Sequence, residues 1–320
     1  MPRKRIGVMA KNDMETLAVC RICGSEDTRR AALLKSEVDG KEYWAMKCES
    51  CRILFAHPMP DLSVDDLERI YGPTYTEEMS LDAGDHSNMH RAAIHRQMDI
   101  VERYAHKGNA LNVGAMGGAV HVLEERGWNL QLVDVSRSAA ERARREWGMD
   151  VTISRLEDLP PGESFDFVRL GHVIEHLPDP KLALRRIAQI LRPGGILQVE
   201  TDNSEGLRTR IELLVRRILG EPLAERLVRI LTKKNLRKRY GRLIPPVHLH
   251  IFCPRNLIRL LEDSGFEVIV VFKPAMADPT WAPLKDMSDF SPVEQVFIRL
   301  DQVGARFGLG DLIALVARKR

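Results

Sequence analysis

The sequence predicts an α/β fold in which a doubly wound, mostly parallel sheet carries helices on both faces, with a small metal-bound module ahead of it. Three observations support this. Strand-length apolar runs alternate with helical patterns from about residue 110 onward, a glycine-rich turn follows the first such run, and two Cys-x-x-Cys pairs lie near the N-terminus. Repeated strand, helix, strand units form parallel sheets, and ligands bind beyond the carboxyl ends of the strands.

The composition is that of an ordinary globular protein. Of 320 residues, 44% are hydrophobic and 29% are charged, which argues against disordered, collagen-like and disulfide-scaffold proteins. The formal net charge of +3 does not demand a nucleic-acid partner, and we expect none. No run approaches the roughly 18 apolar residues of a membrane span. The basic start Met1–Ile6 has no apolar segment behind it, so we expect a cytoplasmic protein without a secretory signal.

Four of the five cysteines form two pairs, Cys20 with Cys23 and Cys48 with Cys51, and 24 residues separate the pairs. Two knuckles at this spacing bring four thiolates onto one tetrahedral Zn²⁺. Disulfides are the competing interpretation, but thiolates in the expected reducing compartment bind metal instead. Because a four-cysteine site has no open coordination position, its predicted role is structural, within a zinc-ribbon module at residues 1–75.

A linker and a leading helix are expected at residues 76–107. Apolar residues recur at helical spacing between Met89 and Tyr104, so the helix should lead directly into the main domain. The main domain is then expected at residues 108–320, with a basic helical insertion at 204–247.

The main domain alternates strands and helices in order. One helix is expected to open with a capping box at Ser138 and Glu141, and another at the N-cap Asp179 with Pro180 in its first turn. A further helix is expected at 254–263. The predicted strands are 110–113, 130–133, 151–153, 165–170, 196–200, 268–272 and 312–317.

Two features of the first two strands predict a nucleoside site. The glycine-rich turn Gly114–Gly118 lets a ligand approach the backbone, and Asp134 ends the next strand, where an acid can accept hydrogen bonds from ribose hydroxyls. The alternative is that the glycines only make a tight turn and Asp134 only caps a helix. A nicotinamide enzyme is disfavoured because the second and third glycines of the dinucleotide fingerprint would fall at Met116 and Ala119.

Six short segments carry further motifs, at residues 111–118, 133–136, 164–168, 173–180, 191–195 and 248–252. In these segments the sequence resembles the class I S-adenosylmethionine-dependent methyltransferases, especially ubiquinone-pathway and sugar or polysaccharide-associated members, some of which carry an N-terminal zinc ribbon. The resemblance implies a Rossmann-like seven-stranded sheet in the order 3-2-1-4-5-7-6, with the last strand antiparallel. The sequence departs from the family in the first motif, where Asn112 replaces an acid and Met116 a glycine.

The resemblance also implies a cofactor and a function. S-adenosylmethionine would donate a methyl group to a small hydroxylated, sugar or lipid-linked acceptor, most readily at oxygen. The alternative is a non-catalytic, methyltransferase-like binding or scaffold module with a degenerate cofactor loop. The cofactor-binding residues implied in this way are Gly114, Met116, Gly117, Gly118, Asp134, Val135, Leu156 and Gly171.

The chemistry is expected just after the fourth predicted strand, because methyl transfer is an in-line displacement that depends on positioning and proton removal. The resemblance implies a second divalent ion held by His172, Glu175, His176 and His248, and a histidine in the first position would favour Zn²⁺ over Mg²⁺. A second alternative makes His176 or His248 a metal-free general base. In a third, purely structural alternative, Glu175 and His176 only stabilise the turn that follows.

The insertion is strongly basic. Residues 205–244 contain 12 Arg and Lys against 4 Glu, with apolar residues at helical spacing. Such helices can cover the core as a solvated cap, or contact an anionic membrane surface or a lipid-linked acceptor. An anionic sugar nucleotide or nucleic acid is the remaining alternative. The sequence gives no indication of the oligomeric state.

Overall fold

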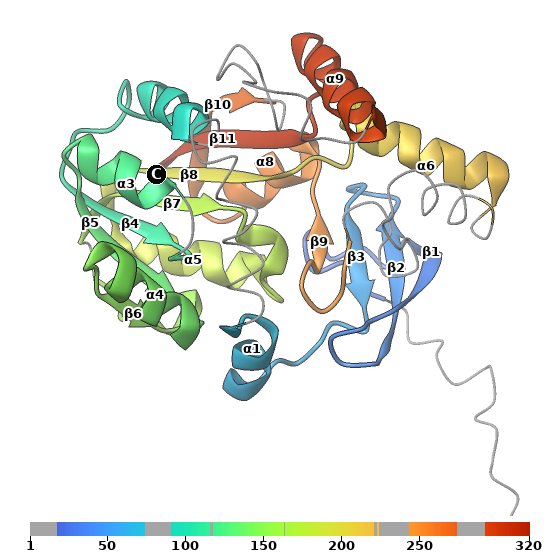
Figure 1. Cartoon of the computed structure of the whole chain (residues 1–320), viewed down its shortest axis with the longest axis horizontal. Coiled ribbons are helices and arrows are strands. Elements are labelled where there is room, and N and C mark those ends of the chain that lie inside the picture. The colour runs from blue at the N-terminus through green and yellow to red at the C-terminus, as the bar shows by residue number, and fades with distance from the viewer. Residues whose placement is uncertain are drawn as a thin grey trace, which may run out of the picture.

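The computed structural model describes residues 18–73, 91–115, 118–162, 164–220, 223, 243–273 and 292–320. Over these residues the central sheet has seven strands in the order β10-β11-β8-β7-β4-β5-β6 (Figure 1). Its strands are β4 (Asn109–Val113), β5 (Asn129–Asp134), β6 (Val151–Ile153), β7 (Phe165–Gly171), β8 (Leu191–Asp202), β10 (Phe266–Phe272) and β11 (Leu312–Lys319).

The strand pairing produces a switch point beside β4. The five strands β4 to β8 pair in parallel, whereas β11 is antiparallel to both β8 and β10. Counted along the chain, this is the order 3-2-1-4-5-7-6 that the resemblance implies. The carboxyl ends of β4, β5 and β7 meet at one edge, where a ligand of such a sheet binds.

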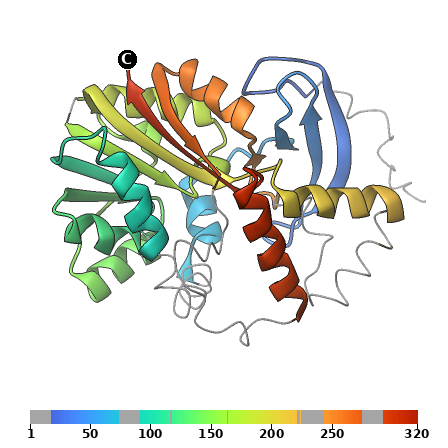
Figure 2. The same ribbon diagram turned by 90° about the horizontal axis from the view of Figure 1, so that it is seen from above.

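Two hydrophobic clusters cover the two faces of the sheet, and alternate residues of one strand enter different clusters, as the two-residue period of a strand requires. Ala110 of β4 and Phe167 of β7 pack against residues 91–101, which are helical, and against α3 (Ala119–Glu125). Their neighbours Leu111 and Val168 face the cluster formed with α5 (Pro180–Ile190) and α8 (Pro254–Glu262). Figure 2 shows the sheet between these two layers.

The helix starts confirm one expectation and correct another. Asp179 caps α5, accepting a hydrogen bond from the Leu182 N–H at 3.0 Å. The capping box at Ser138 is wrong, because α4 (Arg137–Trp147) already begins three residues after the end of β5 and its N-cap is Ser136. Ser136 has the extended backbone that an N-cap needs, and its hydroxyl accepts from the Ala139 N–H.

The N-terminal residues form a second sheet, in the order β1-β2-β3-β9. Its first three strands are β1 (Thr28–Lys35), β2 (Glu42–Cys48) and β3 (Leu54–His57). The fourth, β9 (His250–Ile251), comes from the far end of the chain and pairs with β3. The cysteine-bearing segment therefore packs directly onto residues that follow the insertion (Figure 1).

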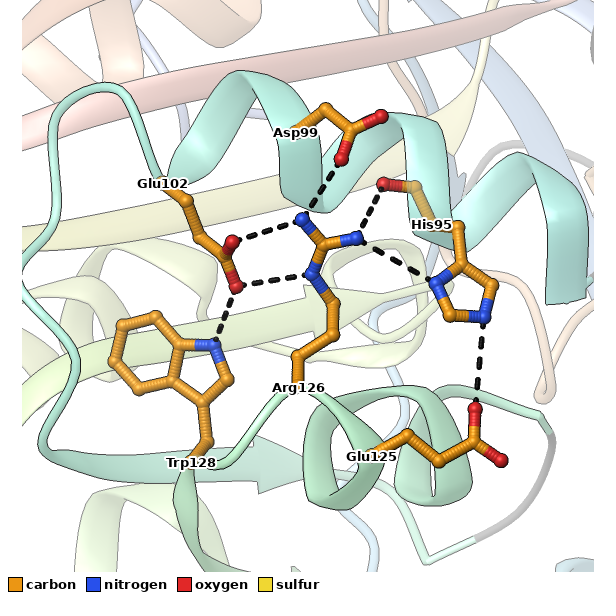
Figure 3. A network of polar contacts seen from close by, with 6 residues as sticks. All are labelled: His95, Asp99, Glu102, Glu125, Arg126 and Trp128. Carbon is orange, nitrogen blue, oxygen red and sulfur yellow. Dashed lines mark hydrogen bonds and ion pairs between the residues drawn. The ribbon is translucent and has the colours of Figure 1, made fainter.

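A cluster centred on Arg126 fixes the leading helix to α3 (Figure 3). The Arg126 guanidinium donates two hydrogen bonds to Glu102, at 2.9 and 2.8 Å, and one to Asp99 at 2.7 Å. Trp128 donates to the same Glu102 carboxylate at 3.1 Å. This bidentate pairing holds the helix at 91–101 against the sheet.

Only part of the insertion is described: α6 (Leu207–Leu219), which packs against α9 (Pro292–Arg306), and a few residues after it. Among the described residues, none of the helices has both the length and the apolar character needed to cross a membrane.

Candidate functional site

The glycine-rich turn leaves β4 at Gly114, which has a φ of +88° that favours glycine. The turn is held by backbone and side-chain hydrogen bonds. The Gly114 N–H donates to the Val133 carbonyl at 2.8 Å, and the Asn112 side-chain amide donates to the Gly114 carbonyl at 2.6 Å. Asn112, the departure from the family pattern, therefore supports this turn through a bond that an ionised acid could not donate.

Asp134 lies at the end of β5, directly beside this turn. Its carboxylate accepts hydrogen bonds from the Ala115 N–H at 2.7 Å and from the Ser136 N–H at 2.8 Å. With the Val135 N–H also directed at this carboxylate, one of its roughly four acceptor sites remains for a ligand. Burial raises the pKa of Asp134, whereas these backbone donors act in the opposite direction. The arrangement presents an acceptor at the switch point, as expected for a ribose-binding acid.

The structure brings most of the other predicted cofactor residues to the same edge. Gly118 is the N-cap residue of α3, the Val135 N–H points to the Asp134 carboxylate, and Gly171 ends β7. Leu156 is buried in a short 3₁₀ turn that follows β6. Met116 and Gly117 lie outside the described residues.

A buried arginine lies beneath Gly171. Arg169 is 5% exposed, and its guanidinium lies 3.5 Å from the Asn112 side-chain oxygen and 3.8 Å from the Glu200 carboxylate. A Cβ on Gly171 would lie only 2.1 Å from an Arg169 Nη atom, so the glycine provides the space for this side chain. Burial lowers the pKa of Arg169, and Glu200 opposes that effect.

His172 pairs with two carboxylates. It has a φ of +55°, its Nδ1 lies 3.3 Å from Glu175, and its Nε2 lies 3.3 Å from Glu200. Burial disfavours the charged imidazole, but the hydrogen bonds that its ring N–H groups donate to the two carboxylates outweigh burial and raise the pKa of His172 well above its usual value. Burial likewise opposes ionisation of Glu175, yet His172 lowers the pKa of that carboxyl to about 2.

Glu175, His176 and His248 meet at the end of β7. One side-chain donor atom from each lies within 4.8 Å of the others, a grouping that suits a divalent ion. The two imidazole rings are 4.7 Å apart and nearly perpendicular. The Leu249 N–H donates to the Glu175 carbonyl at 2.8 Å, and this bond joins the two segments. His172 lies outside the cluster, because both of its ring nitrogens face carboxylates. Its expected role as a fourth metal ligand stays a prediction.

His176 is available as an uncharged imidazole. Burial is the main cause that lowers its pKa to about 4, and neighbouring His248 lowers it further. Its Nδ1 lies 2.9 Å from the Val247 carbonyl. At neutral pH the ring therefore has one nitrogen with a free electron pair, which can accept a proton.

The four paired cysteines also converge. Cys20 lies 3.6 Å from Cys51, Cys23 lies 3.6 Å from Cys48, and all four sulfurs lie within 4.8 Å of one another. This donor set fits the tetrahedral four-cysteine zinc site of the sequence prediction. The Cys51 thiol lowers the pKa of Cys20 to about 5, which favours a thiolate there. Asn256 of α8 donates to the Cys51 carbonyl at 3.2 Å, so this knuckle also contacts the main domain.

Sequence reasoning missed three residues of this region: Arg169, Glu200 and Tyr71. Glu200 had a usable signal, because it ends a predicted strand just as Asp134 does. Arg169 interrupts the apolar run of β7, which marks a buried charge that needs a partner. Tyr71 reaches the site only through the tertiary fold.

Comparison with known proteins also finds methyltransferases. Residues 86–271 match the sequence family described as methyltransferase domain. The ubiquinone biosynthesis O-methyltransferase of a Bradyrhizobium species is 31% identical over 160 residues, covering 48% of this chain and 57% of that protein. The Xanthomonas campestris protein of the same name is 32% identical over 164 residues, covering 48% of this chain and 64% of that protein. The chain thus spans less than two thirds of the length of either relative.

Among solved structures, a chain from the Haloferax volcanii complex of a methyltransferase activator with a methyltransferase is similar in fold. It superimposes with a TM-score of 0.53 at 16% identity, covering 80% of this chain and 97% of that chain.

Proposed function

Since the chain belongs to the methyltransferase domain family through residues 86–271, we propose that it is an S-adenosylmethionine-dependent methyltransferase acting on a hydroxyl group. One observation carries the proposal: the Asp134 carboxylate stands beside the Gly114 turn at the switch point of the sheet. In this position Asp134 would hold the ribose, and the Gly114 turn would lie along the methionine portion. The bound cofactor supplies an electrophilic methyl group on a sulfonium.

The chain's own residues then prepare the acceptor. His176 and His248 face each other at the end of β7, on the edge where Asp134 lies. We propose that the unprotonated nitrogen of His176 accepts the hydroxyl proton of the acceptor. His248 would help to orient that hydroxyl. Positioning and proton removal are the contributions that this reaction requires from a protein.

We propose that the cluster works without a second metal ion. Glu175, His176 and His248 form a donor set that suits a divalent cation. However, the positive charges of Arg169 and His172 already balance the negative charges of Glu175 and Glu200. An added cation would compete with His172 for the Glu175 carboxylate, and a further buried carboxylate, Asp202, lies 4.0 Å from His248 Nδ1. Metal analysis should therefore find one zinc per chain, at the cysteines, and two metal ions per chain would contradict this proposal.

Methyl transfer can be tested directly. The protein is incubated with S-adenosylmethionine labelled in the methyl group and with a panel of phenolic, sugar and lipid-linked hydroxyl compounds. Label should enter at least one class, and His176→Gln should lower the rate by about 100-fold, as expected for loss of a general base. His121→Gln is the matched control, because His121 lies on α3 and packs against Trp147. Equal rates in the two variants would contradict the role of His176.

The described part of the insertion supports a membrane-linked acceptor. The exposed side of α6 carries Leu214 and Ile218, which are 53% and 71% exposed, together with Arg210 and Arg217. Apolar and basic side chains on one exposed helix bind anionic bilayers. We propose that α6 contacts such a surface while the protein stays peripheral. The protein should sediment with phosphatidylserine-containing vesicles, less so at high salt. Ile218→Glu should reduce sedimentation, and no sedimentation of the native protein would contradict the proposal.

A further inference from the structure

The buried guanidinium of Arg169 uses little of its capacity to donate hydrogen bonds. An arginine side chain carries five N–H donors. Within the described part of the chain, Arg169 donates one long hydrogen bond, of 3.5 Å, from Nη1 to the Asn112 side-chain oxygen. The Glu200 carboxylate lies 3.8 Å from Nη2, beyond hydrogen-bond distance, and the buried Nε has no partner among the described residues. Because unpaired buried donors are costly, this site is incomplete without a further acceptor.

The guanidinium lies at the edge of the sheet where a ligand binds. The two neighbours of Arg169 on β7, Val168 and Leu170, are fully buried, whereas the Arg169 side chain keeps 6% of its surface exposed. Nη1 lies only 2.1 Å from the position that a Cβ on Gly171 would take, and Gly171 is the last residue of β7. The side chain therefore extends along the strand to its carboxyl end, which is the ligand-binding edge of a parallel sheet.

Asn112 joins Arg169 to the glycine-rich turn. Its side-chain oxygen accepts from Arg169, and its side-chain amide donates to the Gly114 carbonyl at 2.6 Å. The guanidinium thus lies next to the turn along which the methionine portion of the cofactor would lie. That portion ends in a carboxylate, the one negative charge of S-adenosylmethionine and of S-adenosylhomocysteine. A guanidinium and a carboxylate match in charge and can form two parallel hydrogen bonds.

We propose that Arg169 binds the carboxylate at the amino-acid end of the cofactor. This inference rests on the proposed function and names a residue for the end of the cofactor opposite the adenosyl group. Asp134 would hold the ribose and Arg169 the carboxylate, so the sulfur that carries the methyl group would be fixed between them. Fixing the reacting atom from both sides contributes to the rate through positioning.

The test is calorimetric titration with two ligands, S-adenosylhomocysteine and its decarboxylated analogue, which lacks only the carboxylate. Native protein should bind S-adenosylhomocysteine about 30-fold more tightly than the analogue, which corresponds to about 2 kcal/mol. Arg169→Met should reduce this ratio to less than about 3-fold, because it weakens binding of S-adenosylhomocysteine alone. Arg169→Gln, which keeps an amide donor but has no charge, should show the same loss. It decides the question if Arg169→Met does not fold, as judged by circular dichroism.

Arg192→Met is the matched control, because Arg192 pairs with Asp166 at the opposite end of β7, at 2.7 Å, and this variant should keep the native ratio. Equal binding of the two ligands by native protein would overturn the inference and leave the proposed function standing. So would a native ratio in the folded Arg169 variants, or an equal loss of both ligands in them. If native protein binds neither ligand, the proposed function fails and the inference fails with it.

Discussion

Replacing Gly171 by alanine should destabilise the protein by displacing the side chain of Arg169. The new Cβ would lie 2.1, 2.6 and 2.7 Å from three atoms of the Arg169 guanidinium. This guanidinium is the flexible end of a side chain, but it is 5% exposed and lies between Asn112 and Glu200, so it has little space to move into. Displacing it separates the buried Glu200 carboxylate from its arginine partner.

Breaking a buried pair costs about 3–5 kcal/mol, and we expect about 3 kcal/mol because His172 still contacts Glu200. The free energy of unfolding is measured by urea titration in a double-mutant cycle with Arg169→Met. In the Arg169→Met background the clash is gone, so Gly171→Ala should cost less than about 1 kcal/mol. An equal loss in both backgrounds would show that the guanidinium does not occupy the space beside Gly171.

Three further predictions address the zinc site, the leading helix and the dependence on pH. Cys48→Ser should reduce bound zinc from one ion per chain to none in a chelator-dye assay, because three thiolates no longer complete the tetrahedron; retention of a full equivalent would contradict the site. Arg126→Ala should lower the free energy of unfolding by about 2 kcal/mol because Glu102 loses a bidentate donor, whereas Arg145→Ala, 69% exposed, should cost less than about 0.5 kcal/mol. Equal losses in these two variants would mean that the cluster of Figure 3 contributes nothing. The pKa of His172 is raised in the folded protein, so the stability that His172 contributes by pairing with Glu175 and Glu200 is complete below about pH 6.5. This stability is lost as the pH rises through the pKa of His172 in the folded protein. Urea midpoints between about pH 6 and 9.5 should therefore fall more steeply in native protein than in His172→Gln, and parallel curves would refute the pairing.

Much of the main sheet could be predicted from the sequence, because its strands are local apolar runs. All seven predicted strands fall within observed ones, although β8 begins earlier than expected, at Leu191 instead of 196. The position of Asp134 at a strand end was predictable for the same reason, since a strand ending in an acid after a glycine turn is a local pattern.

Features that depend on distant segments were not predictable in this way. The pairing of β9 with β3 joins residues almost 200 positions apart, and nothing local in either strand specifies it. The helix α9 is not among the helices that the sequence pattern predicts. The family resemblance implies that His172 is a metal ligand, but it does not reveal the contact of His172 with Glu200 on the neighbouring strand. Tyr71 reaches His176 across 105 positions, and only the folded chain brings them together.

Calorimetric titration with S-adenosylhomocysteine tests the central claim most directly, because the claim depends on Asp134 as the ribose acceptor. Native protein should bind with a dissociation constant on the order of micromolar, corresponding to about 8 kcal/mol. Asp134→Ala should abolish the heat of binding. Asp134→Asn, which keeps one acceptor for the backbone N–H groups, should weaken binding while circular dichroism shows an unchanged fold. No binding by the native protein, or equal binding by all three proteins, would contradict the claim.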